Sequence, residues 1–272
     1  MTRKAMAVFA IFTFTFALAS GSSGSARANL VLNGGLDLYT PGTLFNPPFP
    51  AGDLQYSPVT NWTSPLLNLS GTTTGNLLYL PGTGDTTGSL YYNTGLGGPV
   101  ATAFALWGPN NGSNNGLPAT SPAGGNYLAL DSDPLFNGTL SQTINGLSVG
   151  QPYQLDFWWA GAQLSLTTGA TTDQLQVSLG NQTQSTAVVA NPSQGFTGWM
   201  FQTLYFTAQN NSEVLSFLAV GGPSGLPPFV LLDGVNLNAV PEPSTLLTAS
   251  LAVGLFGIGA ARRLRRRNTA AV

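Results

Sequence analysis

The side chains in this chain that could do chemistry carry oxygen atoms or aromatic rings. The 272 residues include no His and no Cys. The commonest general base and metal ligand is therefore missing, as are thiol nucleophiles, thiolate zinc sites and disulfide bonds. Ten Asp and Glu residues remain, with Trp and Tyr residues set among Asn, Ser and Thr. Such residue types suit oxygen-ligated cations and contacts with sugars.

Two neighbouring carboxylates come closest to a catalytic pattern. Asp131 and Asp133 lie two residues apart, with Asp156 further along, and glycosidases use a pair of carboxylates at a set separation. Acidic residues in a loop rich in Gly, Ser and Pro are more often turn formers or calcium ligands. The sequence has no nucleophile elbow, phosphate-binding loop or dinucleotide fingerprint. We therefore expect no enzyme, and a glycan-active hydrolase is the least favoured interpretation.

Two tryptophans lie in long polar stretches, where they could stack on a sugar ring. Asparagines that could bind sugar hydroxyls follow the second of them. The sequence thus predicts a ligand-binding set of Trp62, Trp107, Asn110 and Asn111. The alternative for each Trp is core packing or anchoring of its loop. Two further tryptophans, at 158 and 159, are adjacent in a predicted strand, so one of them should face the core.

The charges are distributed very unevenly. All eight Lys and Arg residues lie at or before Arg27 or at or after Arg262, and all ten acidic residues lie between. Nucleic-acid binding requires a basic face, so we exclude that class. The carboxylates also have no ion-pair partner within their own domain, and buried carboxylates need pairing or a metal.

The N-terminus reads as a secretory signal. Two basic residues precede an apolar stretch over 5–19, and Ala26 and Ala28 form a small-x-small cleavage pattern. We expect signal peptidase to remove residues 1–28, so that the exported chain begins at Asn29. The alternative is an N-terminal anchor that is never removed.

The C-terminus, residues 240–272, has three parts. A Pro-bounded polar motif precedes an apolar stretch over 245–261, which is at the lower limit of about 17 residues for a spanning helix. A basic cluster follows and would hold the C-terminus in the cytoplasm. The motif is Val240, Pro241, Glu242, Pro243 and Ser244, and the cluster is Arg262, Arg263, Arg265, Arg266 and Arg267. A plain single-pass anchor or an unprocessed Pro-rich linker are the alternatives.

These three parts, in this order, resemble the PEP-CTERM sorting signal over residues 240–267. The resemblance implies that an exosortase recognises Pro241, Glu242 and Pro243 and cleaves nearby. Each Pro fixes φ and lacks an N–H, which keeps the motif extended and accessible. The resemblance also implies transient anchoring in the inner membrane of a Gram-negative bacterium. Delivery to the cell surface or the extracellular polymer would follow.

The middle of the chain predicts one all-β domain over residues 29–239. Short runs of β-favouring residues alternate with Gly, Pro and Asn turns, and no stretch keeps a helical period. Many short strands of this kind indicate a jelly-roll β-sandwich. The predicted strands are Leu77–Leu80, Asn126–Leu130, Thr139–Ile144, Tyr153–Ala160, Asp173–Leu179, Trp199–Ala208, Glu213–Val220 and Phe229–Asn238.

Several segments of this domain are similar to exported galactose-binding-like jelly rolls: 29–37, 125–131, 140–147, 150–157 and 232–237. In that class a structural calcium often joins the opening loop to the closing strand. Asp37 and Asp233 match those two positions, and Asp131 could add a third carboxylate. The resemblance therefore implies a calcium site at these residues. The alternative is that they are exposed turn residues that bond their own backbone.

The function that we expect is a structural or adhesive role at the cell surface or in the exopolysaccharide matrix of a biofilm. The alternative is a calcium-dependent, lectin-like carbohydrate-binding module. The expected partners are signal peptidase and exosortase for processing and, in the matrix, glycans.

Overall fold

A computed structural model describes residues 29–39, 59–64, 76–86, 89–92, 101–134, 137–165, 167–226 and 228–241. The predicted signal peptide with Ala26 and Ala28 lies outside this part. So do Glu242, Pro243 and Ser244, the predicted helix over 245–261 and the five arginines of the basic cluster. In the part that is described, no helix is both long enough and apolar enough to cross a membrane.

The described chain is built almost entirely of antiparallel strands. One short 3-10 helix, η1 (Pro109–Asn111), interrupts them. The strands are β1 (Leu77–Tyr79), β2 (Ser89–Tyr92), β3 (Ala101–Phe104), β4 (Tyr127–Asp131), β5 (Leu140–Asn145), β6 (Pro152–Gln163), β7 (Thr171–Leu179), β8 (Gln182–Ser185), β9 (Val189–Asn191), β10 (Met200–Thr207), β11 (Ser212–Gly222) and β12 (Pro228–Ala239).

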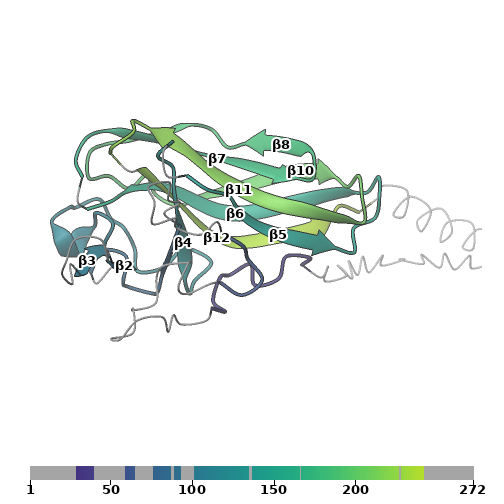
Figure 1. Ribbon diagram of the computed structural model, residues 1–272, viewed down its shortest axis with the longest axis horizontal. Coiled ribbons are helices and arrows are strands. Elements are labelled where there is room, and N and C mark those ends of the chain that lie inside the picture. Colours follow the sequence, from purple (N-terminus) through teal and green to yellow (C-terminus); the bar gives the residue numbers. More distant parts are fainter. Residues whose placement is uncertain are drawn as a thin grey trace, which may run out of the picture.

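Two sheets face each other and form a sandwich. One has the order β1-β4-β12-β6-β10, and the other has the order β5-β11-β7-β8, with β9 also paired to β7. In Figure 1 the sheet with β5 and β11 lies in front of the sheet with β6 and β12. The hairpin of β2 and β3 stands apart from both. The all-β, two-sheet architecture is as predicted, and each of the eight predicted strands is present within a few residues.

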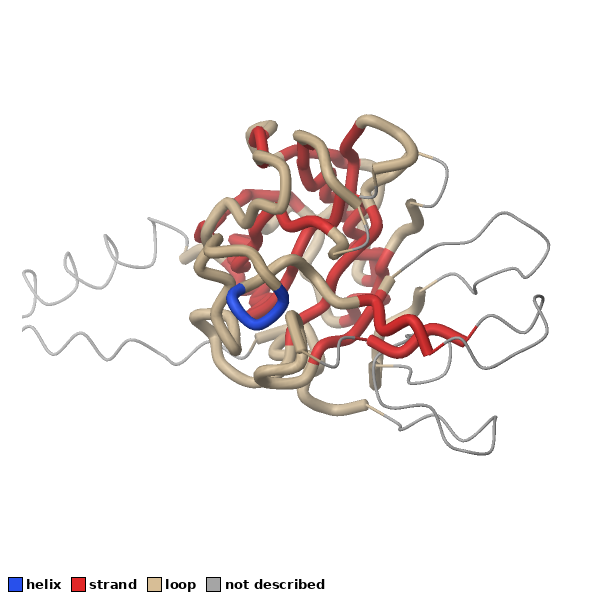
Figure 2. Tube along the Cα trace, turned by 90° about the vertical axis from the view of Figure 1, so that its left-hand side faces the viewer, coloured by secondary structure: helices blue, strands red, loops and turns tan. Residues whose placement is uncertain are grey.

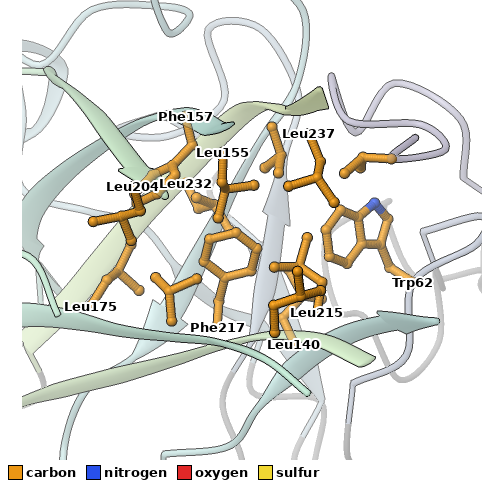
Figure 3. Packing of buried hydrophobic residues seen from close by; sticks show 14 of the residues in the cluster. Trp62, Leu140, Leu155, Phe157, Leu175, Leu204, Leu215, Phe217, Leu232 and Leu237 are labelled. Atoms are coloured by element: carbon orange, nitrogen blue, oxygen red, sulfur yellow. The ribbon is translucent and has the colours of Figure 1, made fainter. Parts of the chain in front are cut away.

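The main core lies between the two sheets because apolar residues alternate along the strands. In β7 every second residue is buried, Leu175 and Val177 among them. Phe157 of β6 meets Phe217 of β11 edge to face, with ring centroids 5.4 Å apart. Figure 3 shows the Phe217 ring at the centre of the packed side chains and Phe157 above it.

A second apolar cluster covers one end of the outer face of the five-stranded sheet. Tyr79 and Tyr127 stack there at 5.5 Å, and Trp199 meets Tyr127 edge-on. Leu106 and Leu117 come from the loops that lie over these rings. Figure 2 shows loops and the single helical turn gathered at this end. The loops that the structure describes do not cover the other half of this outer face, where Phe201 and Tyr205 of β10 and Asn236 of β12 are exposed.

Glutamine side chains close the free edge of β10. Gln182 and Gln184 of β8 donate from Nε2 to the carbonyls of Thr207 and Tyr205, each at 2.5 Å. Gln182 also accepts a hydrogen bond from the Thr207 N–H at 3.2 Å. An unpaired strand edge is a template for pairing with another chain, so these side chains block such pairing.

We predict that the double substitution Gln182→Ala and Gln184→Ala promotes self-association. Each lost hydrogen bond also costs about 0.5–1.5 kcal/mol of stability. Light scattering after gel filtration should show a concentration-dependent rise in mass, and urea unfolding a lower midpoint. Gln176→Ala, an exposed glutamine on the outer face of β7, is the matched control. An unchanged mass and midpoint in the double variant would show that these two glutamines do not protect the free edge of β10.

Candidate ligand-binding face

The open half of the outer face carries a regular grid of side chains that could contact a ligand. We call it the ligand face. β6 pairs with β10 on one side and with β12 on the other, so residues in register stand side by side. The ligand face consists of Gln154, Asp156 and Trp158 from β6, Phe201, Thr203 and Tyr205 from β10, and Asn236 and Asn238 from β12. Successive rows lie about 7 Å apart along the strands.

Aromatic rings stand at both ends of the ligand face. Trp158 is half-buried and meets Phe201 at a centroid distance of 5.1 Å, with the ring planes tilted by 61°. Phe201 is 55% exposed and Tyr205, two rows away, is 57% exposed. Their neighbour Trp159 is 2% exposed and belongs to the core. The prediction that one of the two adjacent tryptophans faces inward is therefore confirmed.

Asp156 occupies the centre of the grid. Gln154 donates from Nε2 to Oδ2 at 2.8 Å and to Oδ1 at 3.1 Å. Thr203 donates from Oγ1 to Oδ1 at 2.6 Å. Asn236 is its register partner on β12. The donors Gln154 and Thr203 are thus both neutral, and amides and a hydroxyl from the carboxylate's own row and the next row surround it.

The ligand face is bounded beside Trp158 by a loop that packs on β12. Gly234 has a positive φ of 64°, and a Cβ at this position would lie 2.8 Å from the Ala123 side chain and 3.2 Å from Trp158. The close approach therefore requires a glycine here. Ser121, in the same loop, donates its hydroxyl to Asp233 of β12. Asp37 accepts a hydrogen bond from the Asn126 N–H at 2.8 Å, at the end of this loop.

Asp37 and Asp233, which the resemblance assigned to one site, are electrostatic neighbours. Burial, with a smaller contribution from the Asp37 carboxylate, raises the pKa of Asp233 to about 7. Hydrogen bonds from Ser121 and from the Gly234 N–H, at 2.6 Å, oppose this increase. Asp233 is fully buried and Asp37 is exposed, so the pair lies where the loop meets the solvent.

Asp131, the predicted third calcium ligand, lies elsewhere, and that part of the prediction is wrong. It ends β4, whereas the Asp37–Asp233 pair lies beside the start of β4. A strand of five residues separates the two places by roughly 16 Å. Among the residues that are described, no three His, Cys, Asp or Glu side chains are grouped as metal ligands.

Asp131 belongs instead to a buried acidic cluster at the end of β4, with Asp133 and with Asp173 of β7 as its neighbours. Burial, together with an acidic neighbour in each case, raises the pKa of Asp131 to about 7 and the pKa of Asp173 to about 8. Ser132 donates from Oγ to Asp173 Oδ1 at 2.8 Å, while Asp173 Oδ2 has no hydrogen-bond partner among the described residues. Asp131 is 6% exposed and Asp173 is fully buried.

Trp62, which we expected in an exposed loop, is a core residue. It is 7% exposed and packs on Phe217 at a centroid distance of 6.1 Å. Its indole N–H donates to the Asn33 carbonyl at 3.0 Å. Figure 3 shows the ring beside Leu140 and Leu215. Its burial rules out stacking on a ligand, so this prediction is corrected.

Trp107, Asn110 and Asn111 anchor a loop. The indole N–H of Trp107 donates to the Thr167 carbonyl at 2.7 Å. Asn110 donates to Asp85 from its backbone and its side chain, and Asn111 donates from Nδ2 to the Leu106 carbonyl at 2.7 Å. These bonds occupy the polar groups that we assigned to a ligand. The alternative of loop anchoring is therefore the one that this geometry supports.

The sorting motif begins where the sandwich ends. Ala239 is the last residue of β12, and the Val240 N–H donates to the Pro152 carbonyl at 2.8 Å. Gln151 donates from Nε2 to the Val240 carbonyl at 2.6 Å. Pro241, the next residue, is exposed. The first motif residue is thus fixed to the domain and the second is accessible.

The buried acidic groups predict that stability falls as the pH rises. An aspartate whose pKa is raised on folding binds its proton more tightly in the folded state, so stability is lost between about pH 4 and the folded pKa. One such group contributes about 1.4 kcal/mol per pH unit. We expect urea unfolding in chelator to give a free energy at pH 8 at least about 1.4 kcal/mol below that at pH 5. Asp173→Asn should reduce the difference, and a flat or rising profile would contradict the cluster's protonation.

Comparison with solved structures gives low overall similarity to several domains. A tailspike domain of bacteriophage CBA120 has a TM-score of 0.34 at 13% identity and covers 78% of this chain, which spans only 21% of that chain. The K3 adhesin domain of Lys-gingipain from Porphyromonas gingivalis has a TM-score of 0.34 at 12% identity, covering 69% of this chain and 96% of that one. The carbohydrate-binding module TmCBM61, solved with β-1,4-galactotriose, has 0.28 at 21% identity, covering 43% and 72%.

Sequence comparison gives a family match at the C-terminus. No curated protein matches the chain. Residues 239–267 match the family model described as the PEP-CTERM protein-sorting motif. This match confirms the resemblance that the Pro-Glu-Pro motif, the apolar stretch and the arginine cluster indicated. The chain therefore carries a PEP-CTERM sorting motif, which implies export, processing by an exosortase and sorting to the cell surface.

Proposed function

We propose that this protein is an adhesive component of the cell surface or extracellular polymer matrix, and that it holds glycan chains on the ligand face. The exposed aromatic residues at both ends of a grid of amide, hydroxyl and carboxylate groups support the proposal most directly. The sorting motif implies export to the cell surface, and a face exposed there could meet polysaccharides, which supports the proposal.

The chemistry of the grid suits a sugar polymer. Sugar rings present apolar C–H faces that can lie on Trp158, Phe201 and Tyr205. Their hydroxyls need hydrogen-bond partners, which the polar side chains between these aromatic residues can supply. Phe201 and Tyr205 are four residues apart on one strand, about 13 Å. A ligand that contacts both rings is therefore an oligosaccharide chain rather than a single sugar.

We also assign the sandwich to the jelly-roll class. The order β4-β12-β6-β10 opposes the order β5-β11-β7-β8, and β4, β5, β6 and β7 alternate between the two sheets along the chain. This crossing pattern, with both sheets antiparallel, is the arrangement that two Greek keys produce.

A purely structural matrix role is the second candidate, and the opposite face of the molecule favours it. The outer face of the four-stranded sheet is uncharged: Thr143 of β5, Val214 of β11 and Gln176 of β7 are exposed there. A flat face of hydroxyl, amide and β-branched side chains can pack in a matrix without a defined pocket.

Calcium stays a proposal, now restricted to Asp37 and Asp233. Two neighbouring carboxylates with no basic residue between positions 27 and 262 suit a hard cation with oxygen ligands. Such an ion would join the opening segment to β12, and Ser121 could supply a further oxygen.

We expect millimolar calcium to raise the melting temperature at pH 8 by a few degrees, because an ion that binds only the folded state stabilises it. Calorimetry with and without chelator measures the shift. Asp233→Asn should abolish it, whereas Asp173→Asn, in the separate buried cluster, should retain it. If calcium does not change the melting temperature of the wild type, the proposed calcium site is wrong.

The ligand face itself is tested by truncating its aromatic residues. Trp158→Ala and Tyr205→Ala should each weaken binding to a responsive polysaccharide at least about tenfold, equivalent to about 1.4 kcal/mol. Affinity electrophoresis against a panel of soluble neutral polysaccharides, followed by calorimetry, measures this. Val214→Ala, on the opposite face, is the control. No retardation by any polysaccharide, or equal retardation of wild type and Trp158→Ala, would favour the structural matrix role.

A further inference from the structure

We infer that Asp156 determines the specificity of the ligand face, which takes uncharged glycan chains and rejects anionic ones. This inference rests on the proposed glycan binding and goes further, because it names the class of glycan and the residue that selects it. It is carried by the position of one carboxylate within the grid and by the lack of any Lys or Arg among the residues that the structure describes.

Asp156 lies where a bound chain must pass. Its row is between the row of Trp158 and Phe201 and the row of Gln154 and Tyr205. A glycan that contacts the aromatic residues at both ends therefore crosses the carboxylate. Asp156 is half-buried at this crossing point, so its oxygen atoms can contact the ligand.

The groups around Asp156 leave its negative charge without compensation. Its hydrogen-bond donors, Gln154 and Thr203, are both neutral. The chain has no Lys or Arg between Arg27 and Arg262. A uronate or sulfate group placed over this row would face a like charge, and the domain supplies no counter-ion. The resulting repulsion would disfavour anionic glycans.

The same carboxylate is favourable for an uncharged sugar. A carboxylate offers about four acceptor positions, and hydrogen bonds from Gln154 and Thr203 occupy three of them. The remaining position can accept a hydrogen bond from a sugar hydroxyl, and hydrogen bonds to ionised acceptors are the stronger kind. Asp156 thus favours neutral glycans by accepting hydrogen bonds from their hydroxyls, and it disfavours anionic glycans by repulsion.

The test compares one polysaccharide in two forms. A neutral polysaccharide that binds the protein is oxidised at its primary hydroxyl to the uronate, which changes charge and little else. Full-length protein in a sugar-free detergent is titrated with both forms in chelator. We expect the wild type to bind the neutral form at least about tenfold more tightly, a difference that added salt should reduce by screening the anionic form.

Asp156→Asn retains the shape of the side chain and removes its charge. It should bring the two affinities to within about threefold of each other. Most of this change should come from tighter binding of the oxidised form, because the like charge that repels it is gone. Asp85→Asn is the control for net charge, because Asp85 lies in the loops away from the ligand face. This variant should leave the ratio of the two affinities unchanged.

The outcomes separate the inference from the proposed function. An unchanged ratio in Asp156→Asn, or equal binding of both forms by the wild type without salt dependence, overturns the role of Asp156 alone. Neutral-glycan binding that survives Trp158→Ala overturns the ligand face itself. If Asp156→Asn does not fold, the salt dependence of the wild type decides: an affinity for the oxidised form that does not rise with salt contradicts the inference.

Discussion

The pairing of β12 with β6 is the interaction on which the rest of the molecule depends. These are the two longest strands, and β12 is central in its sheet, with β4 on its other side. The ladder is in register from Pro228 to Asp233 and again from Asn236, with a bulge between. The bulge contains Gly234, where the loop of Ala123 approaches, and it sets which residues of β12 face outward.

The same ladder fixes the N-terminal end of the described chain. Asn29 accepts a hydrogen bond from the Leu237 N–H at 2.9 Å and donates to the Val235 carbonyl at 3.3 Å. The first described residue and the last strand are therefore joined, and Asp37 is brought to Asp233 by this attachment. One strand thus organises the acidic pair, the outward amides of the ligand face and the start of the sorting motif.

The sequence predicted well those features that depend on local pattern. Alternating apolar residues in β7 and β11 gave their position and their buried faces. β8, with the sequence Gln-Thr-Gln-Ser, carries no apolar period, and its role depends on where β10 lies. Trp158 and Phe201 are far apart in the chain, so their pairing follows from the register of β6 with β10, which no local pattern reveals.

The errors at the predicted site have the same origin. Trp62 was assigned to a ligand because its surroundings are polar, but an isolated bridge between Thr63 and Ser141 draws this segment against the core. Asp131 was grouped with Asp37 because both are acidic, although they lie at opposite ends of β4. Residue type indicates what chemistry is available. The register of distant strands decides which of these groups meet.

The arrangement of β12 also relates binding to sorting. Asn238 is in the row of Gln154 and Tyr205, and Val240, two residues later, is already part of the motif. Pro152 and Gln151 hold Val240 through both its N–H and its carbonyl, so the end of the strand cannot fray without losing these bonds. The domain and its motif are therefore joined without a spacer. Any force on the tail is transmitted to the central strand of the sheet that carries the ligand face.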